Sequence, residues 1–279
     1  MTDSTMIKNN VSDFKETARQ LRVDIIRMIE AAGSGHPGGS LSVIDLLTVL
    51  YSKFLRHDPK RPDWPERDRV ILSKGHACPA LYAVMAHSGY FPKEKLMTLR
   101  KLGSALQGHP DRLKLPGIEF STGSLGQGLS VGLGMAMAAK LDKKDYRTYV
   151  ILGDGEIQEG QCWEAFMSAP KFKLDNLTMI LDHNNGQIDG HVDEVMPIDP
   201  MVDKLRAFGW DVVSINGHDF AEIERAFSDT KKTNGAPQAI VAKTIKGKGV
   251  SFMENVIAWH GKAPNKEEAD RAVKEILNA

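Results

Sequence analysis

The sequence predicts an α/β protein in which a parallel sheet carries helices on both faces. Short apolar runs typical of buried strands recur along the chain, and longer segments with helical spacing fill most of the intervals between them. This alternation continues without a low-complexity linker, which favours a single sheet built from βα units. We therefore expect residues 1–279 to form one domain.

The first expected elements are helical. Apolar side chains recur at helical spacing over residues 14–32. A mostly apolar helix is expected over residues 41–55, with Ser40 as its cap. The segment 126–141 is rich in Gly, Ala and Met, so we expect most of it to pack as a core helix.

The expected strands are short and apolar, and each is followed by a turn or a helical segment. They are residues 69–72, 148–152, 178–181, 212–215 and 239–244.

Two of these strands end in polar residues suited to binding a metal ion. Asp154, flanked by Gly153 and Gly155, follows one strand, and Asn184 follows the next. The carboxyl ends of parallel strands form a ligand-binding edge, and glycine lets the backbone approach a phosphate closely. A helix expected from about residue 158 to 172 presents its free N–H groups to the same place. Carboxylate and amide oxygens suit Mg²⁺ that also holds diphosphate oxygens.

The Gly-Asp-Gly sequence alone is equally consistent with a surface aspartate after an ordinary strand. An Asn-Asn pair lies roughly 28 residues downstream, after a helix and a second strand, and this favours a metal site. The spacing resembles the metal–diphosphate motif of thiamine diphosphate enzymes. Further segments narrow the resemblance to the transketolase family: GHPGGS (35–40), LSKGHACPALY (72–82), GHPD (108–111), GSLGQG (123–128) and WHGKAP (259–264).

The resemblance implies a thiamine diphosphate-binding fold, thiamine diphosphate as cofactor, and Mg²⁺ (or Ca²⁺ or Mn²⁺) as metal. It assigns the metal to Asp154, Asn184 and Gly186. Ser124 stands where many bacterial and yeast members have proline. The implied cofactor-binding residues are His76, Gly123, Ser124, Leu125, Gly153, Gly155, Glu156, Glu159, Asn184, Lys246 and His260.

Four histidines are candidate catalytic residues. A lone histidine is usually a surface or structural residue, but His36, His76, His109 and His260 each lie in a glycine-flanked loop. Ketol transfer moves protons at sugar hydroxyls near neutral pH, which suits imidazole. The resemblance implies proton transfer and alkoxide stabilisation by His36 and His260, and contacts of His76 and His109 with donor hydroxyls and cofactor.

Other residues have two interpretations at this stage. Lys246 could neutralise the diphosphate or be a solvated lysine at a strand end. Glu159 could belong to a glutamate network between subunits, as the resemblance implies, or be a solvated residue in the first turn of a helix. Cys78 and Cys162 lack metal-ligand spacing, so we expect buried free thiols.

Composition excludes several functional classes. The 36 basic and 36 acidic side chains balance, so nothing favours nucleic acid or an acidic membrane as partner. The first ten residues, MTDSTMIKNN, lack the apolar core of a signal peptide, and no apolar run reaches spanning length. We expect a cytoplasmic protein.

Transketolases as a family also carry a pyrimidine-binding domain and a carboxyl-terminal domain, and this sequence resembles neither of them. The chain thus resembles the amino-terminal subunit of a split transketolase. This implies a separately encoded partner with the pyrimidine-binding half, in a complex with two copies of each chain. Together they would transfer a two-carbon ketol unit from a ketose phosphate to an aldose phosphate.

Two alternatives stay open. One is a subunit of a related thiamine diphosphate enzyme, such as a deoxyxylulose phosphate synthase or an enzyme for a branched or sulfonated sugar. The other is a non-catalytic homologue that has kept the fold. In this family the residues that clamp the sugar phosphate lie mostly in the missing half, so the sequence does not choose the sugar.

Overall fold

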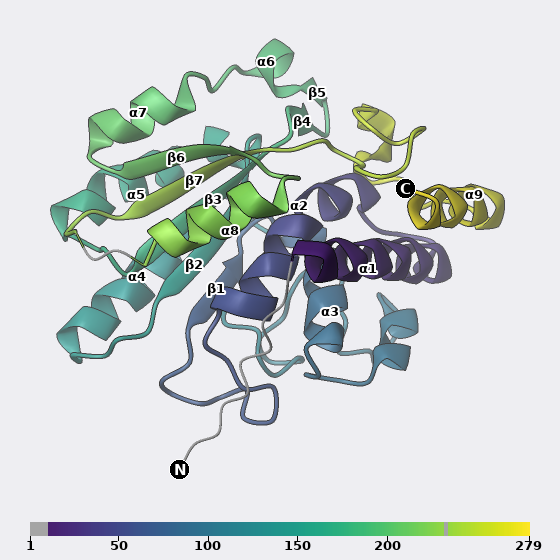
Figure 1. Ribbon diagram of the computed structural model, residues 1–279, viewed down its shortest axis with the longest axis horizontal. Helices are drawn as coiled ribbons and strands as arrows, with labels where there is room; N and C mark the ends of the chain where they lie inside the picture. Colours follow the sequence, from purple (N-terminus) through teal and green to yellow (C-terminus); the bar gives the residue numbers. More distant parts are fainter. Residues whose placement is uncertain (1–10, 232–233) are drawn as a thin grey trace.

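A five-stranded parallel sheet forms the centre of the computed structural model, which describes residues 11–231 and 234–279 (Figure 1). The strand order is β1-β2-β3-β7-β6, and every neighbouring pair is parallel. The strands are β1 (Arg69–Leu72), β2 (Thr148–Gly153), β3 (Leu177–His183), β6 (Asp211–Asn216) and β7 (Gln238–Lys243). A small antiparallel pair, β4 (Gly186–Gln187) and β5 (Gly190–His191), follows β3.

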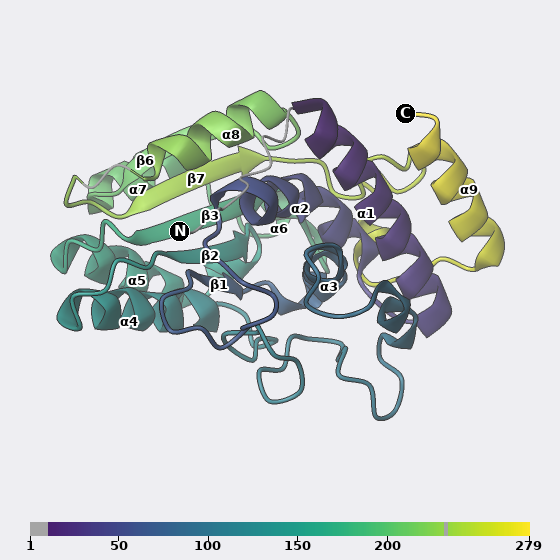
Figure 2. The same ribbon diagram turned by 60° about the horizontal axis from the view of Figure 1, so that its bottom comes forward.

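Helices cover both faces of this sheet, as Figure 2 shows from a second direction. They are α1 (Val11–Ala32), α2 (Pro37–Val49), α3 (Cys78–His87), α4 (Gln127–Leu141), α5 (Gly160–Lys171), α6 (Val192–Val195), α7 (Met201–Phe208), α8 (Phe220–Asp229) and α9 (Lys266–Leu277). Short 3-10 turns include η2 (Gly75–Ala77), η3 (Lys93–Thr98), η4 (Glu156–Gln158) and η5 (Ile257–His260), and a π-helical turn, η1 (Leu50–Phe54), continues α2.

The two faces of the sheet have separate apolar cores. Along β2, Tyr149 and Ile151 pack with the buried side chains of α1, α2 and α3, whereas Val150 and Leu152 pack with those of α4 and α5. Side chains alternate between the faces of a strand, so a strand covered on both sides must be apolar throughout. This explains why the strands are continuous apolar runs in the sequence.

The sheet has a switch point between β3 and β7. The chain adds β1, β2 and β3 side by side, then places β6 at the far edge and returns with β7 next to β3. Connections leave in opposite directions at such a point, which opens a crevice at the carboxyl ends of the strands. Asn184 follows β3 and Lys246 follows β7, so both lie at this crevice.

The five expected strands are confirmed, with ends that differ by at most two residues. The start of the second helix is a correction. It begins at Pro37 and not near residue 41, so the GHPGGS segment includes its first turn. Ser40 lies inside α2 and is not its cap; its Oγ donates 2.7 Å to the carbonyl of His36. Proline is favoured in a first turn, because the N–H that it lacks would have no partner there.

Both cysteines are buried and free, as expected, and they lie in α3 and α5. Across the described ranges, the helices fall short of the length and apolar character needed to cross a lipid bilayer. The first ten residues, on which the expectation of no signal peptide depends, lie outside the described residues.

Candidate active site

A cavity of about 310 Å³ opens at the carboxyl ends of β2 and β3. Its walls come from the turn after β2, the β4–β5 hairpin, the 3-10 turn η2 and the loop after β7. Eleven of the residues predicted from the sequence line it: His76, Leu125, Gly153, Asp154, Gly155, Glu156, Glu159, Asn184, Gly186, Lys246 and His260. The structure therefore brings together residues that are up to 184 positions apart in the chain, from 76 to 260.

The three residues predicted to hold a metal meet at this cavity. Asp154 is only 1% exposed, and it accepts hydrogen bonds from the backbone N–H groups of Gly155 (2.9 Å) and Asn185. Asn184 Oδ1 accepts the N–H of Gly186 at 3.0 Å. Burial, and then the nearby carboxylate of Asp182, raise the pKa of Asp154.

This donor set fits a divalent cation. No lysine or arginine pairs with Asp154 in the described part of the chain, so a buried carboxylate lacks a counter-charge. Amide and main-chain carbonyl oxygens of Asn184 and Gly186 lie beside it. An Asp, an Asn and a main-chain oxygen match the hard, oxygen-rich coordination of Mg²⁺ or Ca²⁺.

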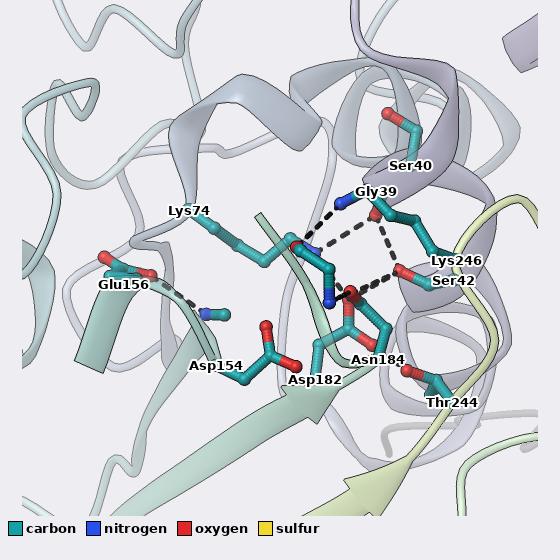
Figure 3. A network of polar contacts seen from close by, with 12 residues as sticks. Gly39, Ser40, Ser42, Lys74, Asp154, Glu156, Asp182, Asn184, Thr244 and Lys246 are labelled. Atoms are coloured by element: carbon teal, nitrogen blue, oxygen red, sulfur yellow. Dashed lines mark hydrogen bonds and ion pairs between the residues drawn. The ribbon is translucent and has the colours of Figure 1, made fainter. Parts of the chain in front are cut away.

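A buried network around Asp182 fixes the amide of Asn184 (Figure 3). Asp182 is fully buried and accepts hydrogen bonds from Lys74 Nζ, Ser42 Oγ (2.6 Å) and Thr244 Oγ1. It also accepts from Asn184 Nδ2 at 3.0 Å. Burial opposes ionisation of Asp182, but Lys74 and these hydrogen bonds outweigh it and lower its pKa. Asp182 is therefore a buried carboxylate at neutral pH.

Lys246 points into the cavity. It is 2% exposed, and its Nζ donates 2.9 Å to the carbonyl of Gly186. The alternative of a solvated strand-end lysine is therefore wrong. Burial, and then repulsion from Lys74, lower its pKa to about 8. An ammonium group without a carboxylate partner, at the wall of a cavity, suits an anionic ligand.

Glu156 joins three of the loops that surround the cavity. Its Oε1 accepts from Ser73 Oγ and, at 2.9 Å, from the N–H of Gly126, and its Oε2 accepts from the N–H of Gly153 at 3.0 Å. Burial raises the pKa of Glu156, and these hydrogen bonds offset part of the increase. Its carboxylate thus ties the GSLGQG turn and the strand β2 to the segment before η2.

Three of the predicted histidines form a cluster beside the cavity. The ring centres of His36, His76 and His260 are 5.1–5.5 Å apart. Burial is the main cause that lowers their pKa values, to about 4 for His36 and about 3 for His260, and well below 6.5 for His76. All three rings are neutral at pH 7, so each can both donate and accept a hydrogen bond.

Arg100, which the sequence reasoning missed, fixes the tautomer of His36. Its Nη2 lies 3.4 Å from His36 Nδ1. Arginine only donates, so Nδ1 is the acceptor and the ring proton lies on Nε2. Arg100 stands outside every motif quoted from the sequence, and only the folded chain brings it to His36.

The remaining predicted residues lie at the edge of this site. Gly123 has φ +146°, and the ring of His109 packs against it. His109 and Ser124 are exposed and, like Gly123 and His36, do not line the cavity itself. Glu159 is exposed at the cavity and is the N-cap residue of α5, so the structure leaves both interpretations of it open.

Sequence reasoning also passed over Lys74, Asp182 and Ser42. Lys74 and Asp182 each stand at the end of an apolar run, residues 70–72 and 178–181 respectively, where a charge is unusual. That position was the available signal. Ser42 lies within an apolar helix, and its role depends on contacts that only the fold creates.

Comparison with known proteins finds one family along nearly the whole chain. The family model described as "Transketolase, thiamine diphosphate binding domain" matches residues 12–278. The crystal structure of transketolase from Campylobacter jejuni superimposes with a TM-score of 0.91 at 38% identity, over 96% of this chain and 43% of that one.

Curated relatives fall into two sizes. A subunit of the apulose-4-phosphate transketolase of Phocaeicola vulgatus is 46% identical over 255 residues, which is 91% of this chain and 90% of that protein. A 6-deoxy-6-sulfo-D-fructose transketolase subunit of a Clostridium species is 46% identical over 264 residues, 95% of this chain and 96% of that protein. Human transketolase is 42% identical over 270 residues, but the match spans only 42% of its length.

Proposed function

The chain belongs to the transketolase family, as its thiamine diphosphate-binding domain, and from this we propose that it is the amino-terminal subunit of a split transketolase. The observation that carries the proposal is the cavity at the sheet's carboxyl edge, where a buried carboxylate without a counter-charge and a buried ammonium group face each other. We propose that residues 1–279 act as a single domain and that a separate chain carries the pyrimidine-binding half. The relatives of similar length that are named as subunits support this assignment.

We assign the anchoring of the cofactor's diphosphate to the deep end of the cavity. Asp154, Asn184 and the carbonyl of Gly186 would hold Mg²⁺ (or Ca²⁺ or Mn²⁺), which would in turn bind diphosphate oxygens. Lys246 would supply a second positive charge. The glycines beside this end, Gly153 and Gly155, would let the diphosphate approach the backbone.

The turn that precedes α4 and the 3-10 turn η2 would contact the rest of the cofactor. We assign this to His76, Gly123, Ser124 and Leu125, with His260 on the opposite wall. Glu156 would act by holding the turn in place, because its carboxylate accepts the N–H of Gly126. Glu159, exposed at the cavity, would meet the partner subunit.

Thiamine diphosphate, when bound, supplies the nucleophilic carbon and the electron sink that ketol transfer requires. The chain's own contribution is proton movement and orientation. His36 and His260, neutral at pH 7, would accept and return the protons of sugar hydroxyls. His76 and His109 would hydrogen-bond to the donor sugar and cofactor.

The donor is the finer part of the proposal. We take it to be a ketose phosphate, with an aldose phosphate as acceptor. The alternative is an unusual sugar, branched or sulfonated, and the names of the two relatives of similar length favour it: one is named for apulose 4-phosphate and the other for 6-deoxy-6-sulfo-D-fructose.

The test is ketol-transfer activity with thiamine diphosphate and Mg²⁺, measured for this chain alone and mixed with the product of a neighbouring gene that resembles a transketolase carboxyl-terminal half. We expect activity only in the mixture, and a panel of ordinary, branched and sulfonated sugars then identifies the donor. Activity of the chain alone at a normal enzyme rate refutes the split assignment. A confirmed complex with bound cofactor that is inactive on the whole panel would favour the non-catalytic alternative.

A further inference from the structure

The loop that carries Lys246 is held by a histidine from another element. The N–H of Ile245, the residue before Lys246, donates 2.9 Å to Nε2 of His218, which lies between β6 and α8. Because a backbone N–H can only donate, Nε2 is the acceptor and the ring proton lies on Nδ1. Only one neutral tautomer of His218 therefore satisfies this contact.

Two charged residues fix that tautomer. His218 Nδ1 donates 2.8 Å to Asp45 Oδ2, in α2. Arg22, in α1, binds the same carboxylate through both terminal nitrogens, at 2.8 and 2.7 Å. Burial opposes ionisation of Asp45, but Arg22 and His218 outweigh it and lower its pKa. A carboxylate that orients a histidine in this way resembles the arrangement that supports ligands at metal centres.

The same set of residues reaches the loop on both sides of Lys246. His218 holds Ile245, and Arg22 Nε donates 3.2 Å to the carbonyl of Lys248. On the cavity side the loop is tied to the start of α2, since the N–H of Gly247 donates 3.0 Å to Gly38. The backbone that flanks Lys246 is thus fixed by hydrogen bonds from α1, α2 and the loop before α8.

Packing does not replace these hydrogen bonds on the outer side of the loop. A second cavity, of about 170 Å³, lies there and is lined by Arg22, Asp45, His218, Lys248 and Gly249, among others. A loop with a cavity behind it has few apolar contacts to hold it in place. The position of the loop therefore depends on the polar contacts of His218 and Arg22.

We propose that His218, oriented by Asp45 and Arg22, is a positioning residue that holds Lys246 in the cofactor cavity and so sets the affinity for the diphosphate group. The inference rests on the proposed function, because it takes the ligand of Lys246 to be the cofactor's diphosphate. His218 does not touch that cavity and acts through the backbone of Ile245.

Two substitutions separate the two contacts of His218. His218→Asn keeps a polar atom near Nδ1 but removes the acceptor for Ile245, whereas His218→Gln can place an oxygen where Nε2 lies. The measurement is the Kd of the full chain for thiamine diphosphate with Mg²⁺, by isothermal titration calorimetry. We expect His218→Asn to raise the Kd about tenfold, equivalent to about 1.4 kcal/mol, and His218→Gln to stay within about threefold of the wild type. His87→Asn, at the exposed end of α3, is the control and should change nothing.

A double-mutant cycle with Lys246→Met tests whether His218 acts through Lys246. We expect His218→Asn to have no further effect once Lys246 is replaced, and amide hydrogen exchange to show lost protection at Ile245 and Gly247 while β7 stays protected. Unchanged affinity in His218→Asn, a tenfold effect that persists with Lys246→Met, or equal loss of protection in β7 would overturn the inference. Failure of the wild-type chain to bind the cofactor would instead refute the proposed function, together with the inference that rests on it.

Discussion

Asn184 Nδ2 lies 3.0 Å from the carboxylate of Asp182 and 3.3 Å from Ser42 Oγ, and these contacts determine which way the amide faces. A carboxylate only accepts, so the NH₂ group must point to Asp182 and the amide oxygen must point away from it, toward Gly186. The oxygen is thereby presented at the cavity wall beside Asp154. Asp182 is two residues before Asn184 on the same strand end, so the orientation is set locally.

The first prediction concerns this pair of oxygen donors. Asp154→Asn and Asn184→Ala should each weaken binding of thiamine diphosphate in the presence of Mg²⁺ about tenfold or more, because each removes a ligand of the proposed metal. Calorimetric titration of the full chain measures the change. With EDTA in place of Mg²⁺, the variants and the wild type should bind equally weakly. Asp193→Asn, exposed in α6, is the matched control. Full affinity in both variants with Mg²⁺ present would exclude these residues as metal ligands.

The second prediction concerns the buried ion pair between Lys74 and Asp182. Lys74→Met leaves a fully buried carboxylate without its partner, so it should lower the free energy of unfolding by about 3–5 kcal/mol. The double variant Lys74→Met with Asp182→Asn removes both charges and should recover part of the loss. Urea denaturation of the three proteins measures this. If the double variant is less stable than Lys74→Met, the pair does not account for the cost.

The strands were predictable because their signal is local. Each is buried on both faces, so its apolar run is continuous and its ends are marked by polar residues, as at Asp154 and Asn184. The start of α2 was misplaced because residues such as Gly38 and Gly39 usually disfavour a helix. Here they are needed for space: a Cβ on Gly38 would lie 3.0 Å from the side chain of Lys246, and one on Gly39 would lie 3.3 Å from Lys74 Nζ.

The site was predictable where a motif carried it and not where contacts between distant segments created it. His36, His76 and His260 were found through their glycine-rich motifs. Arg100 and His218 could not be, because nothing in their neighbouring residues indicates that one meets His36 and the other meets Ile245. Such pairings depend on the order of strands and helices in space, which a single sequence does not state.

The third prediction tests how tightly α4 packs on the sheet. A Cβ on Gly132 would overlap Cγ2 of Val150 in β2, whereas a Cβ on Gly134, on the exposed side of the same helix, would meet nothing within 4 Å. Gly132→Ala should therefore lower the free energy of unfolding by about 1–3 kcal/mol. Gly134→Ala, the matched control, should raise it by about 0.5–1 kcal/mol, because alanine loses less backbone entropy in a helix. Equal effects of the two substitutions would mean that α4 does not contact β2 in this way.

The fourth prediction follows from the lowered pKa values of the clustered histidines. In the folded protein the pKa is about 4 for His36 and about 3 for His260, against an ordinary value of 6.5. Between these values the unfolded chain binds more protons than the folded one, so stability rises with pH. The contribution is complete above pH 6.5 and is lost as the pH falls toward 4. Each ring can contribute a slope of at most about 1.4 kcal/mol per pH unit, reduced because both rings are partly exposed to solvent.

Urea denaturation between pH 7 and pH 5 measures this slope. His36→Asn and His260→Asn should each give a shallower loss of stability on acidification than the wild type, and the double variant should be shallower still. The comparison between proteins removes the contribution of carboxylates, which all of them share. The physical cause is burial next to cations, Arg100 for His36 and Lys246 for His260, so each ring is kept neutral by its surroundings. Stability curves that run parallel to the wild type over this range would show that the two rings are as free to take up protons in the folded protein as in the unfolded chain.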